Sequence, residues 1–281
     1  MFHNSFKKDV SLHGGVPKQY WHLRNKVLND WEIAPWDLLI YEDRKLGEGN
    51  WATVYLAKWK ETFVAAKVLK QTEKAFLYLR EFDAMTKMHH PNIVQLFGYV
   101  EEPFIIVMEY FEQQDLKKQN YINKSTKKQI SIDILRGLNY FHTRKPEGLI
   151  HRDIKLSNIM LTKSKTAKIA DFGLSKFIKE QIANSQATNL DQLDHTNDLT
   201  ENVGTERYMA PELIKTDYDY KVDIYSTGIL LYELWESKVY NPKQEMYFYW
   251  TPKNIKELIK QMTKFNPTER PDAKQCLRFL A

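Results

Sequence analysis

Apolar residues come in short runs over the first part of the chain, between Leu38 and Tyr110. The runs are rich in β-branched and aromatic residues and are separated by charged or turn-forming residues, a pattern typical of β-strands. They cover 38–49, 51–59, 62–70, 93–100 and 104–110. Residues 72–88 instead show helical spacing, with Thr72 as a candidate N-cap. This pattern predicts a small β-rich region that contains one helix.

The pattern changes after Phe111, where apolar residues recur with helical spacing. Helices are predicted over 125–143, 222–235, 255–265 and 273–280. The second of these is apolar on most faces, which favours a buried central position. The order of the elements therefore predicts an α+β fold, with a small β-rich part followed by a larger helical part.

The composition is that of an ordinary globular protein. Of the 281 residues, 43% are hydrophobic and 27% are charged, which excludes a disordered chain, a collagen and a coiled coil. The net charge is +5 with both signs interspersed, so we expect no nucleic-acid partner. The single cysteine, Cys276, cannot form an internal disulfide, which favours a reducing compartment. We expect Cys276 to be a buried apolar residue rather than a catalytic thiol.

The sequence shows no sign of membrane insertion. No apolar run approaches the roughly 20 residues that span a bilayer, and the N-terminus does not resemble a signal peptide. We therefore expect a soluble cytoplasmic protein with no membrane span. Residues 1–37 are expected to form a polar extension ahead of a domain over 38–281, and they contain three tryptophans. Two interpretations of this extension stay open, a segment that packs onto the domain and a plain linker.

Two features of the β-rich part suggest phosphate chemistry. Gly47 and Gly49 lie between two predicted strands, where glycines let the backbone approach a phosphate closely. The loop leads into a strand and not into a helix, which excludes a dinucleotide-binding turn, although an ordinary hairpin stays possible. Lys67 lies in an apolar strand, where a cation needs a partner. Glu81, on the inward stripe of the predicted helix, is the nearest candidate.

Three features of the helical part carry further candidate chemistry. In the run His151 to Asn158, Asp153 is a potential general base, Lys155 a cation and Asn158 an amide oxygen suited to a hard metal. Asp171 precedes Phe-Gly after an apolar strand. The run 204–212 reads Gly-Thr-Glu-Arg-Tyr-Met-Ala-Pro-Glu.

The order of these motifs resembles that of eukaryotic protein kinases: glycine loop, strand lysine, helix glutamate, His-Arg-Asp with its asparagine, Asp-Phe-Gly and Ala-Pro-Glu. The resemblance covers Leu38 to Ala281 and implies a bilobal fold, with an N-lobe over 38–110 and a C-lobe over 111–281. It also implies that Arg270 pairs with Glu212. A stacked spine anchored by Asp223 is implied for His151, Phe172, Met85 and Leu96.

The resemblance implies a role for each motif residue. The ATP phosphates would be covered by Gly47, Glu48, Gly49, Asn50, Trp51, Ala52, Thr53 and Val54, and Leu46 would also contact ATP. Val54, Ala65 and Met160 would enclose adenine, Met108 would be the gatekeeper, and the backbone from Glu109 to Phe111 would hydrogen-bond the adenine edge. Lys67, held by Glu81, would contact the phosphates, and Asp153 with Lys155 would act on the substrate hydroxyl. Asn158 and Asp171 would hold Mg²⁺ or Mn²⁺.

Lys155, two residues after Asp153, and Thr205, ahead of Ala-Pro-Glu, resemble the residues at these positions in serine/threonine kinases. The resemblance therefore suggests that serine and threonine side chains are phosphorylated. The lead-in around Trp31 resembles the tyrosine-kinase-like group. We therefore predict an ATP-dependent serine/threonine-protein kinase of that group, acting on protein substrates. Three alternatives stay open: a dual-specificity kinase, a tyrosine kinase, and a pseudokinase scaffold that keeps the fold without turnover.

Two segments suggest regulation or docking. Residues 180–202 carry five acidic and no basic residues, which predicts a mobile loop. We expect an upstream kinase to phosphorylate this loop at or near Thr200, with Arg152 binding the phosphate. Glu201 could instead supply a permanent charge, and an unregulated loop is the third alternative. The aromatic residues within 237–254 either fill a core left by a shortened helix or form an exposed docking patch.

Overall fold

The computed structural model describes residues 31–49, 51–70, 75–112, 115–119, 121–178, 206–214 and 218–280. These residues fall into two compact units. The first unit contains the described residues up to Thr86 together with Leu96–Tyr110, and the second contains Lys87–Gln95 and the described residues from Phe111 onward. No helix among the described residues is long and apolar enough to cross a bilayer.

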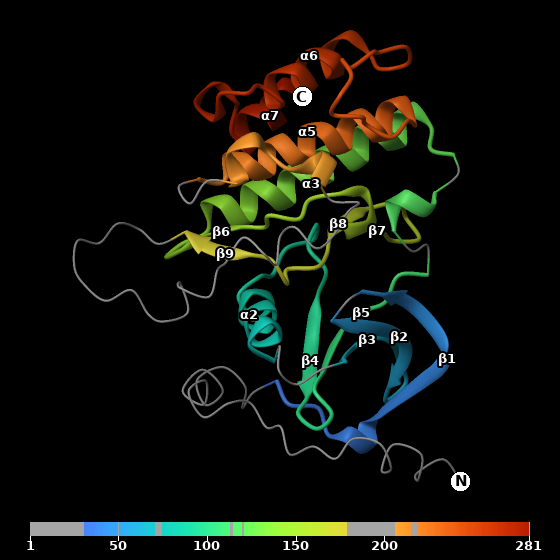
Figure 1. The fold of residues 1–281 in the computed structure, drawn as a ribbon. Helices are drawn as coiled ribbons and strands as arrows, with labels where there is room; N and C mark the ends of the chain where they lie inside the picture. Colours follow the sequence, from blue (N-terminus) through green and yellow to red (C-terminus); the bar gives the residue numbers. More distant parts are fainter. Residues whose placement is uncertain are drawn as a thin grey trace, which may run out of the picture. The chain divides into compact units, whose positions relative to one another are not determined.

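The first unit is built on a five-stranded antiparallel sheet (Figure 1), in the order β1-β2-β3-β5-β4. The strands are β1 (Leu38–Glu48), β2 (Ala52–Trp59), β3 (Thr62–Leu69), β4 (Leu96–Val100) and β5 (Ile105–Glu109). One face buries a cluster that includes Ala57, Val64 and Val107, each with no exposed surface. The predicted strands are therefore confirmed, except at the start of β4.

Helix α2 (Ala75–Thr86) is the one α-helix among the described residues of 38–110, as expected, and the candidate cap Thr72 lies outside the described residues. Part of the N-terminal extension also packs onto the sheet. Ile33, only 4% exposed, donates its amide to Tyr99 O at 2.7 Å, and Tyr99 N donates to Trp31 O at 2.9 Å. Residues 31–33 therefore pack onto the domain and do not form a plain linker.

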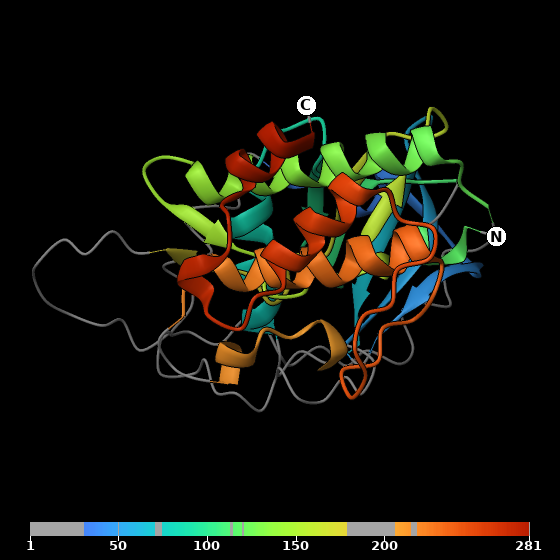
Figure 2. The ribbon, with the colours of Figure 1, turned by 90° about the horizontal axis from the view of Figure 1, so that it is seen from above.

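The second unit is helical (Figures 1 and 2), with α3 (Lys124–Thr143), α5 (Lys221–Glu236), α6 (Lys253–Met262) and α7 (Ala273–Leu280). Helix α5 is buried along nearly its whole length, as its apolar sequence predicts. Cys276 on α7 has no exposed surface, and burial raises its thiol pKa to about 12, which confirms an apolar role. Two small sheets complete the unit, formed by β6 (Gly148–Ile150) with β9 (Lys176–Ile178) and by β7 (Ile159–Leu161) with β8 (Ala167–Ile169).

Two predicted boundaries are wrong, and both errors have a tertiary cause. Residues 93–95 were expected in a strand, but Val94 N donates to Ile169 O and pairs this segment with β8. The helix predicted to Phe265 ends at Met262. The carbonyls of Lys264 and Phe265 accept hydrogen bonds from the Arg270 guanidinium, so the chain turns there.

Arg270 is the largest fully buried side chain of the described residues. Its guanidinium forms a bidentate pair with Glu212, at 2.5 and 2.9 Å, as the resemblance implied. It also donates to Lys221 O at 3.1 Å, and it lies 4.9 Å from the centre of the Tyr225 ring. A buried charge with this many partners is costly to leave without its counter-ion.

Arg270→Met should therefore lower the free energy of unfolding by about 3–5 kcal/mol, because Glu212 would remain buried without its cation. Urea unfolding followed by circular dichroism measures this change. Arg278→Met, at an exposed position on α7, is the matched control and should change stability by less than about 0.5 kcal/mol. Equal effects of the two substitutions would contradict a structural role for the buried pair.

Candidate active site

The sheet of the first unit places several predicted site residues on one face. In the strand register, Val54 lies opposite Lys67, and Ala65 lies opposite Met108. Residues directly opposite each other in an antiparallel sheet share a face, as do residues two apart in one strand. The structure therefore brings these four side chains together.

Lys67 and Glu81 form an ion pair within the first unit. Lys67 Nζ donates to both carboxylate oxygens of Glu81, at 2.8 and 2.7 Å. The Glu81 side chain is 3% exposed and the Lys67 side chain 16% exposed. Because both charges are shielded from water, each requires the other, and α2 is thereby tied to β3. This is the partnership that the sequence suggested.

The glycine loop joins β1 to β2 with open space at its glycines. A Cβ added at Gly47 would meet no described atom within 4 Å, and one added at Gly49 would meet Ala52 O at 3.8 Å. Glu48 accepts from Lys45 and Lys70, and these lysines lower its pKa to about 2. Asn50 lies outside the described residues. The loop backbone therefore leaves room for a bulky anion.

The remaining predicted nucleotide contacts lie on defined elements. Leu46 lies on β1, Thr53 is buried on β2, and Glu109 ends β5. Trp51 precedes β2 and is half-buried. In the second unit, Phe111 is buried and Met160 is half-buried on β7.

Asp153 is the centre of the second unit's chemistry. Its side chain is 5% exposed, and its Oδ2 accepts from Lys155 Nζ and from Asn158 Nδ2, each at 2.8 Å. Oδ1 is buried and has no hydrogen-bond partner among the described residues. Burial raises the Asp153 pKa, the charge of Lys155 opposes this shift, and that of Asp171 adds to it. The carboxylate thus has one oxygen fixed by a cation and an amide, while the other has no hydrogen-bond partner among the described residues.

Asn158 and Asp171 supply oxygen atoms suited to a divalent cation. The amide nitrogen of Asn158 donates to Asp153 O and Oδ2, which leaves its amide oxygen as an acceptor. The backbone amide of Ala170 donates to the backbone carbonyl of Asn158 at 2.8 Å. Asp171 is therefore the next residue in the chain after one that is hydrogen-bonded to Asn158. The described residues contain no group of three or more His, Cys, Asp or Glu side chains that could hold a metal. A carboxylate with an amide oxygen fits Mg²⁺ or Mn²⁺, because both prefer hard ligands and retain water or substrate oxygens.

Asp223 fixes the backbone that precedes Asp153. Its carboxylate has no exposed surface and accepts from His151 N and Arg152 N, each at 2.8 Å, and from His142 Nε2 at 2.9 Å. Arg152 adopts a left-handed conformation with φ of 68°. The His151 and Phe172 rings pack with centroids 4.8 Å apart. This part of the implied spine and its anchor are therefore present in the second unit.

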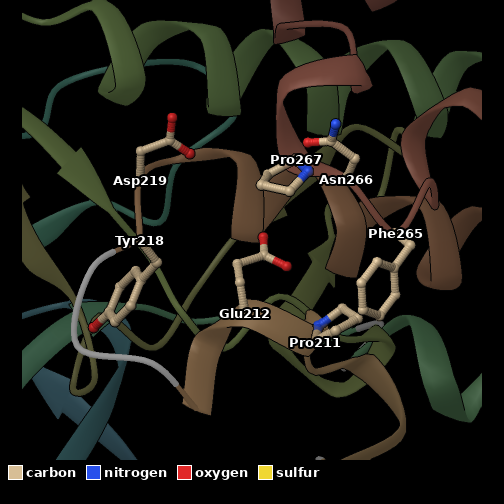
Figure 3. A pocket seen from close by; sticks show the side chains of 7 residues that line it. All are labelled: Pro211, Glu212, Tyr218, Asp219, Phe265, Asn266 and Pro267. Atoms are coloured by element: carbon tan, nitrogen blue, oxygen red, sulfur yellow. The ribbon is translucent and has the colours of Figure 1, made fainter.

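Tyr218 is a functional candidate that the sequence did not reveal. Arg152 donates from Nη1 to Tyr218 Oη at 2.8 Å and from Nε to Leu174 O at 2.5 Å. Tyr218 also lines a surface cavity of about 510 Å³ (Figure 3), together with Pro211, Glu212, Asp219, Phe265, Asn266 and Pro267. Since no spacing rule links Tyr218 to Arg152, the contact follows from the tertiary structure. Thr200, the expected phosphorylation site, and Thr205, which with Lys155 suggested the serine/threonine class, lie outside the described residues.

Comparisons with known proteins agree with this geometry. The family model for the protein kinase domain matches residues 40–279. The serine/threonine-protein kinase VIK of Arabidopsis thaliana is 35% identical over 74% of the chain and 48% of its own length. Serine/threonine-protein kinase CTR1 of the same plant is 33% identical over 71% of the chain and 24% of its own length. Chitin elicitor receptor kinase 1, also from Arabidopsis thaliana, is 33% identical over 69% of the chain and 30% of its own length.

The chain therefore spans less than half the length of these three relatives. The match nevertheless covers most of the chain and all its described motifs, from the glycine loop to Arg270. The α+β architecture and the resemblance read from the sequence are thereby confirmed. The chain belongs to the protein kinase domain family.

Proposed function

We propose that the chain transfers the γ-phosphoryl group of ATP to serine and threonine hydroxyls of protein substrates. The observation that carries this proposal is the arrangement around Asp153. A buried carboxylate holds Lys155 and Asn158 on Oδ2, and its Oδ1 has no hydrogen-bond partner among the described residues. A positioned base, a cation beside it and a nearby oxygen-ligand pair are the groups that phosphoryl transfer requires.

In the proposed reaction, Asp153 Oδ1 orients the substrate hydroxyl and receives its proton. The hydroxyl oxygen forms a bond to the γ-phosphorus as the bond to the ADP oxygen breaks, and ADP leaves with that electron pair. Lys155, held 2.8 Å from Asp153 Oδ2, offsets negative charge at the transferred group. In the first unit, Lys67 binds the α- and β-phosphates in the orientation set by Glu81, and the amides of the glycine loop bind the phosphate oxygens.

Asn158 and Asp171 are the proposed ligands of Mg²⁺ or Mn²⁺. The bound cation supplies neutralisation of the phosphate charge. Asn158 is oriented for this role because its amide nitrogen is committed to Asp153. Asp171 is exposed and has a left-handed backbone, with φ of 66°. A strained conformation at a charged residue is characteristic of functional sites.

The serine/threonine preference is supported by Lys155 and by the relatives VIK and CTR1, which are named serine/threonine-protein kinases. We place the chain in the tyrosine-kinase-like group because of its lead-in sequence around Trp31. The packing of residues 31–33 against β4 makes this lead-in part of the folded domain.

Asp153→Asn should leave ATP binding intact and lower turnover by about 10²–10⁴-fold, because the amide cannot accept the hydroxyl proton. Phosphorylation of a generic basic protein with Mg²⁺ and radiolabelled ATP measures turnover, and calorimetry measures ATP binding. Asp43→Asn, at an exposed position on β1, is the matched control. An unchanged rate in Asp153→Asn would refute its role, and ATP binding by a wild-type chain without turnover would favour the scaffold alternative.

Lys67→Met and Glu81→Ala should each lower turnover, and the double substitution should cost clearly less than the sum, because each single change breaks the same pair. The quantity to compare is the logarithm of kcat/KM for ATP. Lys58→Met removes one member of the exposed Lys58–Glu61 pair and should have little effect. Additive losses would show that Lys67 and Glu81 act independently.

We further propose that phosphorylation at or near Thr200 raises activity through Arg152. Arg152 is 7% exposed and already joins Leu174 to Tyr218, next to Asp153. A phosphate bound by this guanidinium would therefore act directly on the backbone of the catalytic aspartate.

Phosphatase treatment and Thr200→Ala should each lower turnover about tenfold, since a charge-assisted hydrogen bond contributes roughly 1.5–3 kcal/mol. Turnover before and after treatment, with mass spectrometry of the loop, measures the effect. Thr188→Ala is the matched control. If only Glu201→Ala lowers turnover, the permanent carboxylate of Glu201 acts in place of a phosphate. If neither phosphatase treatment nor either substitution lowers turnover, this loop does not regulate activity.

A further inference from the structure

The segment between α5 and α6, residues 237–252, presents large apolar side chains to solvent, and we call it the aromatic loop. Val239 is 64% exposed, Tyr247 55%, Tyr249 74% and Trp250 70%. In Figure 2 the loop is the long orange segment that extends away from the helices. These exposed side chains therefore form a patch, which is one of the two interpretations that the sequence left open.

Two rings of the aromatic loop pack against α5 instead. Tyr240 and Phe248 are half-buried, and each packs against Tyr232, with ring centroids 5.9 and 5.4 Å apart. The second interpretation, that aromatic residues of this segment fill a core, is therefore correct for these two. The fold uses these two rings, and the exposed ones are left for contact with a partner.

Buried carboxylates of α5 hold the backbone of the aromatic loop. Glu236, on α5 and only 6% exposed, accepts from the backbone amides of Tyr249 and Trp250 at 3.0 and 3.1 Å. Glu233, one turn earlier and 4% exposed, accepts from Tyr240 N at 2.9 Å. The backbone that carries the exposed rings is therefore fixed before any partner binds, which reduces the entropic cost of binding.

The aromatic loop and the first turn of α6 are also basic. Residues 237–256 contain four lysines and one acidic residue, Glu245. Lys238, Lys243 and Lys253 are exposed. Because these positive charges border the exposed rings, they favour a partner that offers both apolar contact and negative charge.

The start of α3 adds positive charge from a distant part of the sequence. Lys127 Nζ donates to Trp235 O and to Ser237 Oγ, each at 3.2 Å, which places this part of α3 beside the start of the aromatic loop. Lys124, one turn earlier on the same side of α3, is exposed. The basic character is therefore shared by neighbouring elements, which suits a partner with an extended negative surface.

The chemistry of this surface matches that of an acidic lipid bilayer. Tyrosine and tryptophan combine an apolar ring with a polar atom, and they are enriched where the hydrocarbon of a membrane meets its headgroups. Lysines contact the phosphates of the headgroups, and acidic phospholipids give a leaflet a negative surface potential. The exposed rings stand on a projecting segment, and none of the residues that line the cavity in Figure 3 belongs to it. A projecting segment can enter a deformable layer of headgroups.

We propose that the aromatic loop binds the surface of a bilayer that contains acidic phospholipids. The rings of Tyr247, Tyr249 and Trp250 enter the headgroup layer, and the exposed lysines beside them contact lipid phosphates. Such binding scales with the apolar area buried and with the attraction between opposite charges. It needs no membrane-spanning helix, and it does not rest on the proposed kinase function.

Vesicle binding by the full chain tests this proposal. The chain is mixed with vesicles of phosphatidylcholine alone or of an equal mixture with phosphatidylserine, and sedimentation gives the partition coefficient. The partition coefficient should be roughly tenfold or more higher for the mixed vesicles, because each lysine near an acidic leaflet contributes a factor of about five. Added NaCl should lower it, because salt screens the attraction.

Two variants separate the contributions of the rings and of the charge. Trp250→Ala should lower the partition coefficient for mixed vesicles about tenfold, because it removes the largest exposed ring. The pair Lys243→Glu with Lys253→Glu should lower it by roughly tenfold or more. Circular dichroism verifies that each variant is folded.

The matched controls lie elsewhere in the second unit. Phe265, 80% exposed, and Lys221, the first residue of α5, both donate their carbonyls to the Arg270 guanidinium as acceptors, so Phe265 lies near the end of α5 that is remote from the aromatic loop. Phe265→Ala removes an exposed ring there. The pair Lys274→Glu with Arg278→Glu, at exposed positions on α7, makes the same change in charge as the lysine pair. Both controls should change the partition coefficient by less than about twofold.

A fluorescent label on the aromatic loop measures entry into the headgroup layer. Cys276 is fully buried with a pKa of about 12, so a thiol introduced by Tyr249→Cys is labelled selectively. The emission of an environment-sensitive fluorophore at this position should shift to shorter wavelength when mixed vesicles are added. The same label at Lys274→Cys should show no shift.

Each result either supports the proposal or overturns it. Absence of binding to mixed vesicles, or equal binding by the loop variants and the controls, overturns it and leaves a protein partner as the occupant of the patch. Loss of binding in the lysine pair with no effect of Trp250→Ala and no emission shift overturns the entry of the rings. Because none of these measurements uses ATP or turnover, their outcome is independent of the kinase function.

Discussion

The buried carboxylate of Asp223 is the constraint on which the arrangement around Asp153 depends. A carboxylate that is shielded from solvent needs hydrogen-bond donors for its oxygens. Here the donors are two consecutive backbone amides and an imidazole. Those amides belong to His151 and Arg152, so the carboxylate determines the path of the chain immediately before Asp153. The left-handed conformation of Arg152 persists because these bonds hold it.

The same principle applies to two further buried charges of the site. Lys67 is neutralised by Glu81 within the first unit, and Asp153 by Lys155 within the second. These two pairs hold their charged side chains in fixed positions. Such preorganisation suits phosphoryl transfer, in which the protein contributes position and charge more than covalent chemistry.

Sequence patterns predicted the parts of the molecule whose causes are local. Helices α3 and α5 follow from apolar spacing, and the Asp153, Lys155 and Asn158 group follows from a short motif. The start of β4 was misplaced because Val94 bonds to Ile169, a residue distant in sequence. Tyr218, Glu233 and Glu236 were missed for the same reason, since their partners are selected by tertiary packing and leave no periodic or motif signal.

The pair formed by Glu212 and Arg270 joins positions separated by 58 residues. During synthesis, a ribosome adding roughly 5–20 residues per second makes the second partner about 3–12 s after the first. Throughout that interval the Glu212 carboxylate lacks the cation that makes its burial tolerable. The segment around Ala-Pro-Glu thus cannot reach its final packing while the nascent chain is still short of Arg270. The helical unit therefore completes this part of its packing only after Arg270 has been synthesised.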